Sequence, residues 1–179
     1  FAILSGQKTT GVSLMLIDEG MDTGKIITSK SITITDKEDT RSLTNKLIEL
    51  SDALLRKYVT KYVAGRVKAL EQPHPDRATY SRKLTKLDGV IDWAKPNYEI
   101  EREIRAFIEW PRSRTVFAGK DVIITSVELA KEEGLPGDIS ASNTALQVFC
   151  GVGSVLIKHI QPAGKKEMPV EAFLAGYKH

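Results

Sequence analysis

The stretch VSLMLIDEGMDTGKII, residues 12–27, places an acidic, glycine-containing turn between two apolar segments. Residues 12–17 are nearly all apolar, which predicts a β-strand buried on both faces. Residues 26–35 mix β-branched and polar side chains and predict a more exposed strand. The turn at residues 18–25 holds three carboxylates and two glycines. A surface hairpin needs fewer, so we interpret this turn as part of a candidate active site.

A long amphipathic helix is expected next, with Thr40 as its N-cap and Gly65 at its end. Strand, loop, strand and helix over residues 1–65 predict the tail of an α/β domain, with too few elements for a complete core. The apolar residues of the expected helix recur at steps of three and four: Leu43, Leu47, Leu50, Leu54, Tyr58 and Tyr62.

Residues 66–87 lack periodicity and contain Pro73 and Pro75, so they are interpreted as a linker. A second region, residues 88–179, is expected to begin with a helix that Pro111 ends. Short strand-like runs then alternate with glycine-containing turns, which predicts a small β-barrel of the oligonucleotide-binding (OB) kind, followed by a short helix. The five runs are 114–118, 121–130, 138–141, 145–150 and 154–160.

Composition sets only broad limits on function. The 179 residues carry 41% hydrophobic and 27% charged side chains and a formal charge of +3, which permits RNA binding without requiring it. The single cysteine, Cys150, excludes an internal disulfide and fits a reducing compartment. The histidines are scattered, so no metal site is expected. Apolar runs are shorter than a membrane span and no signal peptide is recognisable, so we expect a cytoplasmic protein without membrane contact.

The chain opens with FAILSGQKTTGV, which lacks an initiator methionine and reads as the end of a helix. We therefore expect a sequence that lacks part of its N-terminal region.

Several blocks of the sequence resemble folate-dependent formyltransferases. TGVSLMLIDEGMDTGKII, residues 10–27, is similar to the segment that carries the catalytic aspartate of that superfamily. KLTKLDGVIDWAKP (83–96), IRAF and WP within 104–111, and QPAGKKEM (161–168) with AFLAG (172–176) resemble successive blocks of the methionyl-tRNA formyltransferase family. The resemblance runs from about Thr10 to Ala175.

The resemblance implies a fold and a reaction. The fold is a Rossmann-like catalytic domain, truncated here to residues 1–65, a basic linker at 66–87 and an OB-like, tRNA-contacting domain at 88–179. The reaction is transfer of a formyl group from the co-substrate 10-formyltetrahydrofolate to the amino group of methionyl initiator tRNA. The family also needs an N-x-H motif and an L-P-x-x-R-G stretch, and neither is present in these 179 residues. We therefore expect this chain alone to be inactive.

The acidic turn supplies the implied catalytic and folate-binding residues. Asp22 matches the catalytic aspartate, and a carboxylate there would take up positive charge as an amine attacks the formyl carbon. Asp18, Glu19, Gly20 and Met21 are the implied folate contacts. For the two acidic residues among them, an ordinary solvated turn is an equal alternative.

Two further features of this turn are left open. Gly20 and Gly24 would provide positive φ angles or a close backbone approach. Thr23 would either donate a hydrogen bond to Asp22 or only form the turn.

Basic residues are the implied tRNA contacts: Arg82, Lys83, Lys86, Lys165 and Lys166. For the lysines, ordinary solvated side chains are an equal alternative. Tyr80 would pack in a core or stack on a base.

The sequence departs from the family at two places. Ile108 and Glu109 replace Asn-Pro, which predicts that the helix continues to Trp110 and that its indole packs against the barrel. Lys25 replaces an aspartate and would add positive charge beside Asp22.

Two other functions remain open: another folate-dependent formyltransferase or hydrolase, and a stand-alone RNA-binding OB-like module. Upstream sequence with the N-x-H motif would decide for the enzyme.

Overall fold

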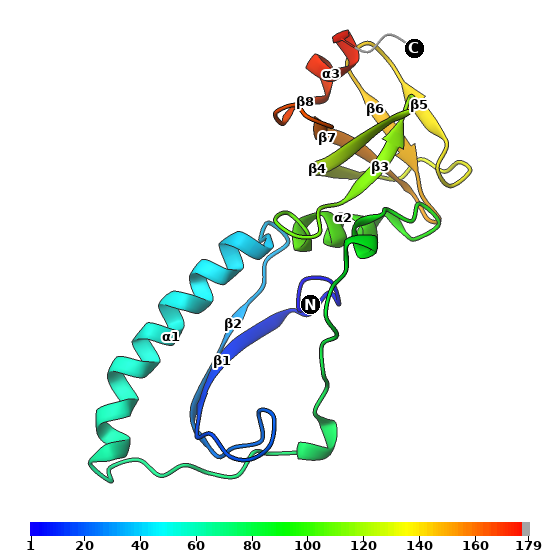
Figure 1. Ribbon diagram of the computed structural model, residues 1–179. Helices are drawn as coiled ribbons and strands as arrows, with labels where there is room; N and C mark the ends of the chain where they lie inside the picture. Colours follow the sequence, from blue (N-terminus) through cyan, green and yellow to red (C-terminus); the bar gives the residue numbers. More distant parts are fainter. Residues whose placement is uncertain (177–179) are drawn as a thin grey trace. The chain divides into compact units, whose positions relative to one another are not determined.

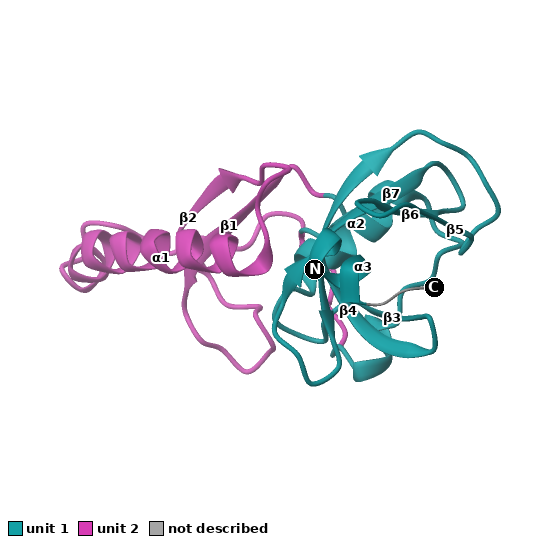
Figure 2. Ribbon diagram, turned by 90° about the horizontal axis from the view of Figure 1, so that it is seen from above, with its two compact units in different colours: residues 1, 3–6, 83–179 teal, residues 2, 7–82 magenta. Residues whose placement is uncertain are grey.

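The computed structural model describes residues 1–176, which form two compact units (Figure 1, Figure 2). The first contains residues 2 and 7–82 and is called the hairpin unit below. The second contains residues 1, 3–6 and 83–176 and is called the half-barrel unit. The division lies within the segment interpreted as a linker.

The hairpin unit consists of two antiparallel strands and one long helix. Strands β1 (Thr9–Met15) and β2 (Ile26–Thr33) pair in register from Thr9 opposite Thr33 to Leu14 opposite Thr28. Helix α1 (Thr40–Val63) follows. The prediction that the first strand is buried on both faces is wrong for these residues, because exposed and half-buried side chains alternate along β1. The described unit supplies only β2 as a neighbouring strand, so the second face of β1 stays open to solvent.

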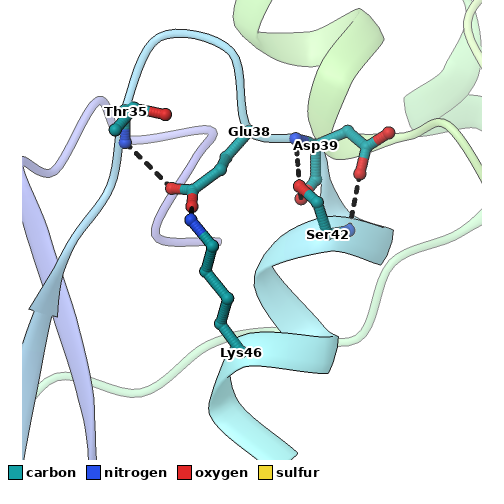
Figure 3. Close-up of polar contacts among 5 residues, drawn as sticks. All are labelled: Thr35, Glu38, Asp39, Ser42 and Lys46. Atoms are coloured by element: carbon teal, nitrogen blue, oxygen red, sulfur yellow. Dashed lines mark hydrogen bonds and ion pairs between the residues drawn. The ribbon is translucent and has the colours of Figure 1, made fainter.

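Polar contacts fix the beginning of α1 (Figure 3). The N-cap is Asp39 and not Thr40, the residue expected from the sequence. The Asp39 carboxylate accepts a hydrogen bond from the Ser42 amide at 2.7 Å, and the Ser42 hydroxyl accepts one from the Asp39 amide at 3.1 Å. This reciprocal pair is a capping box. Beside it, the buried Glu38 accepts a hydrogen bond from the Thr35 amide at 2.9 Å and forms an ion pair with Lys46.

The other end of α1 agrees with the prediction. Ala64 is the C-cap, and Gly65 follows with a φ of +68°. Glycine adopts this left-handed conformation without the penalty that a Cβ atom imposes, so the helix ends here.

The half-barrel unit combines two helices with a curled sheet. The sheet order is β3-β4-β7-β6-β5, and a short β8 pairs with β7. Register shifts between Ile124 and Val127 interrupt the β4–β7 pairing, and such bulges increase the bend of a sheet. Its elements are α2 (Asn97–Ala106), β3 (Arg114–Phe117), β4 (Lys120–Ala130), β5 (Ile139–Ala141), β6 (Leu146–Phe149), β7 (Ser154–Pro162), β8 (Met168–Pro169) and α3 (Val170–Gly176).

The curled sheet, α2 and α3 enclose one apolar core. Ile100 of α2 and Ile160 of β7 have no exposed surface. Phe117 of β3 meets Phe173 of α3 edge to face, with ring centroids 5.4 Å apart. Cys150 also lies in this core, which confirms the expectation that it acts as a small buried apolar group.

Helix α2 ends at Ala106, so the prediction that it continues to Trp110 is wrong. Phe107 caps the helix, and the Arg112 amide bonds back to the Phe107 carbonyl at 3.1 Å across a turn. Phe107 is buried, whereas Trp110 is 56% exposed. The expected packing of the indole against the barrel is therefore wrong too.

Two short 3-10 turns, Pro75–Arg77 and Lys86–Gly89, lie in the segment interpreted as a linker or at its end. Among residues 1–176, no helix combines the length and apolar character that crossing a bilayer requires.

Candidate active site

The acidic turn lies in a loop, residues 16–25, that connects β1 to β2 and is called the acidic loop below. The Leu16 amide donates to the Lys25 carbonyl at 2.9 Å and closes the base of the loop. Gly24 is buried there, and a Cβ atom on it would lie 1.8 Å from the Leu16 carbonyl oxygen. Only glycine fits this close approach.

The two glycines of the acidic loop work through close contacts and not through positive φ angles. At Gly20 a Cβ atom would lie 2.1 Å from the Thr23 hydroxyl oxygen. The left-handed conformation belongs to Asp22 instead, with a φ of +58°. Aspartate tolerates this region better than most residues do, because its short side chain bonds locally.

Hydrogen bonds within the acidic loop centre on Asp18. Its Oδ1 atom accepts from the Gly20 amide at 3.1 Å and from the Thr23 hydroxyl at 2.7 Å. Thr23 therefore donates to Asp18 and not to Asp22. This arrangement gives Asp18 a role in shaping the loop, separate from any contact with a ligand.

Asp22 presents its side chain to solvent at the edge of a hollow of about 290 Å³. Its backbone carbonyl accepts a hydrogen bond from the Gln72 side chain at 2.7 Å. Met21 and Thr23 line the same hollow. The remaining lining comes from the linker segment: Gln72, Pro75, Ala78, Thr79 and Tyr80.

Only some of the site residues predicted from the sequence line the hollow. Asp18, Glu19 and Gly20 are outside its lining, although they belong to the same exposed loop. Tyr80 is 72% exposed, so the alternative of core packing is wrong for this side chain.

Lys25 pairs with Glu71, with the ammonium nitrogen 2.7 Å from the carboxylate oxygen. This hydrogen-bonded ion pair raises the pKa of Lys25 above its ordinary value. The positive charge expected beside Asp22 is thus balanced by a linker carboxylate.

The basic residues implied as tRNA contacts are all exposed. Arg82 and Lys83 adjoin the boundary of the two units, and Lys86 begins the second 3-10 turn. Lys165 and Lys166 lie in the turn between β7 and β8. Gln161 supports that turn by donating to the Lys165 carbonyl at 2.8 Å.

The contribution of residues 72–80 to the hollow was not predicted from the sequence. These residues carry no periodic pattern, and their contacts join positions about 50 residues apart in the chain. Pro73 and Pro75 indicated only a linker. Within the described residues, no group of three or more His, Cys, Asp or Glu side chains is arranged to hold a metal ion.

Comparison with known proteins agrees with the two-part organisation of the chain. The family model described as formyl transferase, C-terminal domain, matches residues 83–178, and the model described as formyl transferase matches residues 1–59. A curated methionyl-tRNA formyltransferase from Myxococcus xanthus is 36% identical over 179 residues. That match covers 99% of this chain but 57% of the relative, so the chain spans little more than half the length of that protein.

Solved structures show a similar fold. HypX from Aquifex aeolicus, in complex with tetrahydrofolic acid, superposes with a TM-score of 0.70 at 20% identity, covering 98% of this chain and 31% of that one. WlaRD, a sugar 3N-formyl transferase determined in the presence of dTDP and 5-N-formyl-THF, superposes with a TM-score of 0.68 at 25% identity, covering 92% of this chain and 59% of that one. Because the C-terminal family model alone matches more than half of the residues, this chain belongs to the formyl transferase family.

Proposed function

We propose that the protein containing this chain transfers a formyl group from 10-formyltetrahydrofolate to the α-amino group of methionyl initiator tRNA, in the cytoplasm. The proposal is carried by Asp22, an acidic side chain that lines a hollow in a chain 36% identical to a methionyl-tRNA formyltransferase. Proteins of similar fold whose structures were determined with tetrahydrofolic acid or in the presence of 5-N-formyl-THF support the choice of co-substrate.

The chemistry needs a carboxylate at this position. The amine nitrogen attacks the formyl carbon and forms a new C–N bond, which leaves a positive charge on nitrogen and a negative charge on oxygen. The bond from the formyl carbon to N10 of the folate then breaks, and N10 takes the proton that the amine loses. Asp22 stabilises the developing ammonium and orients the histidine of the family's N-x-H motif, which lies outside these 179 residues.

The other proposed site residues belong to two surfaces. Asp18, Glu19, Gly20 and Met21 face the folate, mainly through the backbone of the acidic loop. The exposed basic side chains Arg82, Lys83, Lys86, Lys165 and Lys166 bind phosphates of the tRNA.

The domain division belongs to the same proposal. Residues 1–65 are the catalytic portion, 66–87 the linker and 88–179 an OB-like domain. The curled five-strand path with its short β8 is compatible with such a barrel.

A nucleotide-linked amino sugar is the second candidate acceptor, because the sugar 3N-formyl transferase superposes on 92% of this chain. Both acceptors present a primary amine, so the chemistry at Asp22 would be the same. They differ in charge, since a tRNA carries many more phosphates than a nucleoside diphosphate. The exposed basic residues of the half-barrel unit therefore favour the tRNA.

The test is to supply the full-length polypeptide that carries this chain with 10-formyltetrahydrofolate and each acceptor in turn. We expect formylation of methionyl-tRNA at a kcat/KM at least about 100-fold above that for a dTDP-amino sugar, which corresponds to a difference of about 2.7 kcal/mol in transition-state binding. Preference for the sugar would contradict the proposed acceptor. No formylation of either amine would contradict the proposed function. Residues 1–179 alone should give no product.

A further inference from the structure

Three consecutive residues of the linker segment, Leu70–Gln72, bond to the end of the acidic loop and to the first residue of β2. The backbones of Leu70 and Ile26 exchange two hydrogen bonds, at 2.8 and 2.9 Å. The next residue, Glu71, forms the ion pair with Lys25 described above. Gln72 then reaches further back along the loop. All of these residues belong to the hairpin unit, so the contact lies within one compact part of the molecule.

One side-chain amide bridges two backbone carbonyls of the loop. Gln72 Nε2 donates to the carbonyl oxygen of Asp22 at 2.7 Å and to that of Gly24 at 2.9 Å. A carboxamide NH₂ group has two hydrogens, so it satisfies both acceptors at once. A glutamate at this position would offer no donor and would face two carbonyl oxygens.

The two bridged positions differ in how firmly they are held. Gly24 is buried and lies so close to the Leu16 carbonyl that a Cβ atom would not fit. Asp22 is exposed and holds a left-handed conformation, which costs a non-glycine residue roughly 1 kcal/mol and persists only where the surroundings enforce it. Gln72 therefore links the strained, exposed Asp22 to the buried, closely packed Gly24.

We propose that Gln72 is a positioning residue that holds the Asp22 backbone, and through it the carboxylate, in the orientation that formyl transfer requires. This inference rests on the proposed function, because it assigns Gln72 a role in that reaction. A displacement of about 1 Å at a reacting group can lower a rate about 100-fold, so the hydrogen bond to the Asp22 carbonyl, anchored by the second one to Gly24, is enough to matter.

The test uses Gln72→Met, which keeps the length of the side chain and removes both donors. In the full-length polypeptide we expect kcat to fall about 10- to 100-fold, with the KM for each substrate changed less than about twofold. In an Asp22→Asn background the same substitution should change kcat less than about twofold, because no carboxylate is left to position. Asparagine also accepts the left-handed conformation, so that background should keep the loop intact.

A matched control is Gln147→Met in the half-barrel unit. Gln147 also donates two hydrogen bonds, to Glu132 at 3.1 Å and to Ser154 at 2.8 Å, and its loss should leave kcat unchanged. An unchanged kcat in Gln72→Met would overturn the inference. So would equal losses with and without the Asp22 carboxylate, since they would show a general structural effect.

Hydrogen exchange separates this inference from the proposed function. Gln72→Met should speed amide exchange in residues 20–24 whether or not the protein is an enzyme. Unchanged exchange would overturn the inference that Gln72 holds the acidic loop. Absence of formyl transfer in the unsubstituted protein would instead count against the proposed function, while the exchange result would still decide whether Gln72 holds the loop.

Discussion

The two units of the chain are stabilised in different ways. Fifteen buried residues form one continuous core in the half-barrel unit, and Ile100, Val155, Ile160 and Phe173 have no exposed surface. In the described part of the hairpin unit, three apolar side chains are buried: Ile34, Leu43 and Leu54.

The hairpin unit also leaves large apolar side chains in water. Ile17 is 97% exposed and Val63 is 80% exposed. Compared with the half-barrel unit, the hairpin unit depends more on polar contacts for its stability. These contacts include the Glu38–Lys46 pair, the Asp39 cap and the Gln72 bridge. The unit with the denser core thus offers the more rigid scaffold, whereas the unit with the candidate catalytic group depends on local contacts. The following predictions test this difference.

The largest effect is expected from removing a core ring of the half-barrel unit. Phe173→Ala should lower the free energy of unfolding of that unit by about 3–5 kcal/mol, because it removes a fully buried side chain and leaves a cavity. Leu54→Ala in α1 should cost about 2 kcal/mol, since half-exposed neighbours leave room for the site to collapse. Urea denaturation followed by hydrogen exchange measures both units separately. Equal losses at the two sites would refute the proposed difference between the units.

Cys150 reports on the integrity of the half-barrel core. Burial raises the pKa of its thiol from 9.0 to about 11, so the reactive thiolate at pH 8 should be about 100-fold scarcer in the folded unit than in the unfolded chain. Iodoacetamide should therefore alkylate Cys150 at least about 100-fold more slowly without urea than with it. Similar rates would show that the core opens readily.

The same pKa shift has a consequence for stability. Because the pKa of the folded state lies above that of the unfolded state, the contribution of the Cys150 thiol to stability is complete below pH 9.0 and is lost as the pH rises through about 11. In Cys150→Ala this part of the alkaline destabilisation should disappear.

Lys86→Glu should show whether the half-barrel unit contributes to binding of the tRNA separately from binding of the folate at the acidic loop. Reversing this charge should raise the KM for methionyl-tRNA about tenfold in the full-length polypeptide and leave the KM for the folate unchanged, because the nucleic acid alone carries many phosphates. Lys37→Glu, an exposed lysine of the hairpin unit, is the matched control and should affect neither. Equal losses for both substrates would count against an electrostatic role for Lys86.

The smallest effect concerns the cap of α1. Asp39→Ala should destabilise the hairpin unit by about 1 kcal/mol, because the Ser42 amide loses its acceptor. Thr44→Ala, an exposed position in the same helix, should change stability by no more than a few tenths of a kcal/mol. A half-barrel unit that lost as much stability as the hairpin unit would show that the two do not unfold independently.

Local patterns in the sequence predicted most of the elements. The periodic apolar residues of α1 and the glycine-separated strands of the half-barrel unit lie close to their expected positions, because each pattern follows from neighbours a few residues apart. Gly65 ends α1 as expected. The missed β8 has two residues, too few for any pattern to show.

Contacts between distant parts of the chain were not predictable in this way. The hydrogen bonds from Gln72 to the acidic loop span 48 and 50 residues, and no local pattern marks them. Trp110 was expected to be packed but is largely exposed, because its environment depends on where the turn after α2 directs it. The resemblance named the candidate site residues. Only the structure shows that Asp18 bonds within the acidic loop, whereas Asp22 lines the hollow.

The most direct test of the central claim is the turnover of Asp22→Asn in the full-length polypeptide. Asparagine keeps the shape of the side chain and tolerates the left-handed backbone, so the substitution removes little besides the charge. The account predicts that kcat for formylation of methionyl-tRNA falls at least about 100-fold, while the KM for each substrate stays within about twofold. A kcat within twofold of the unsubstituted protein would contradict it.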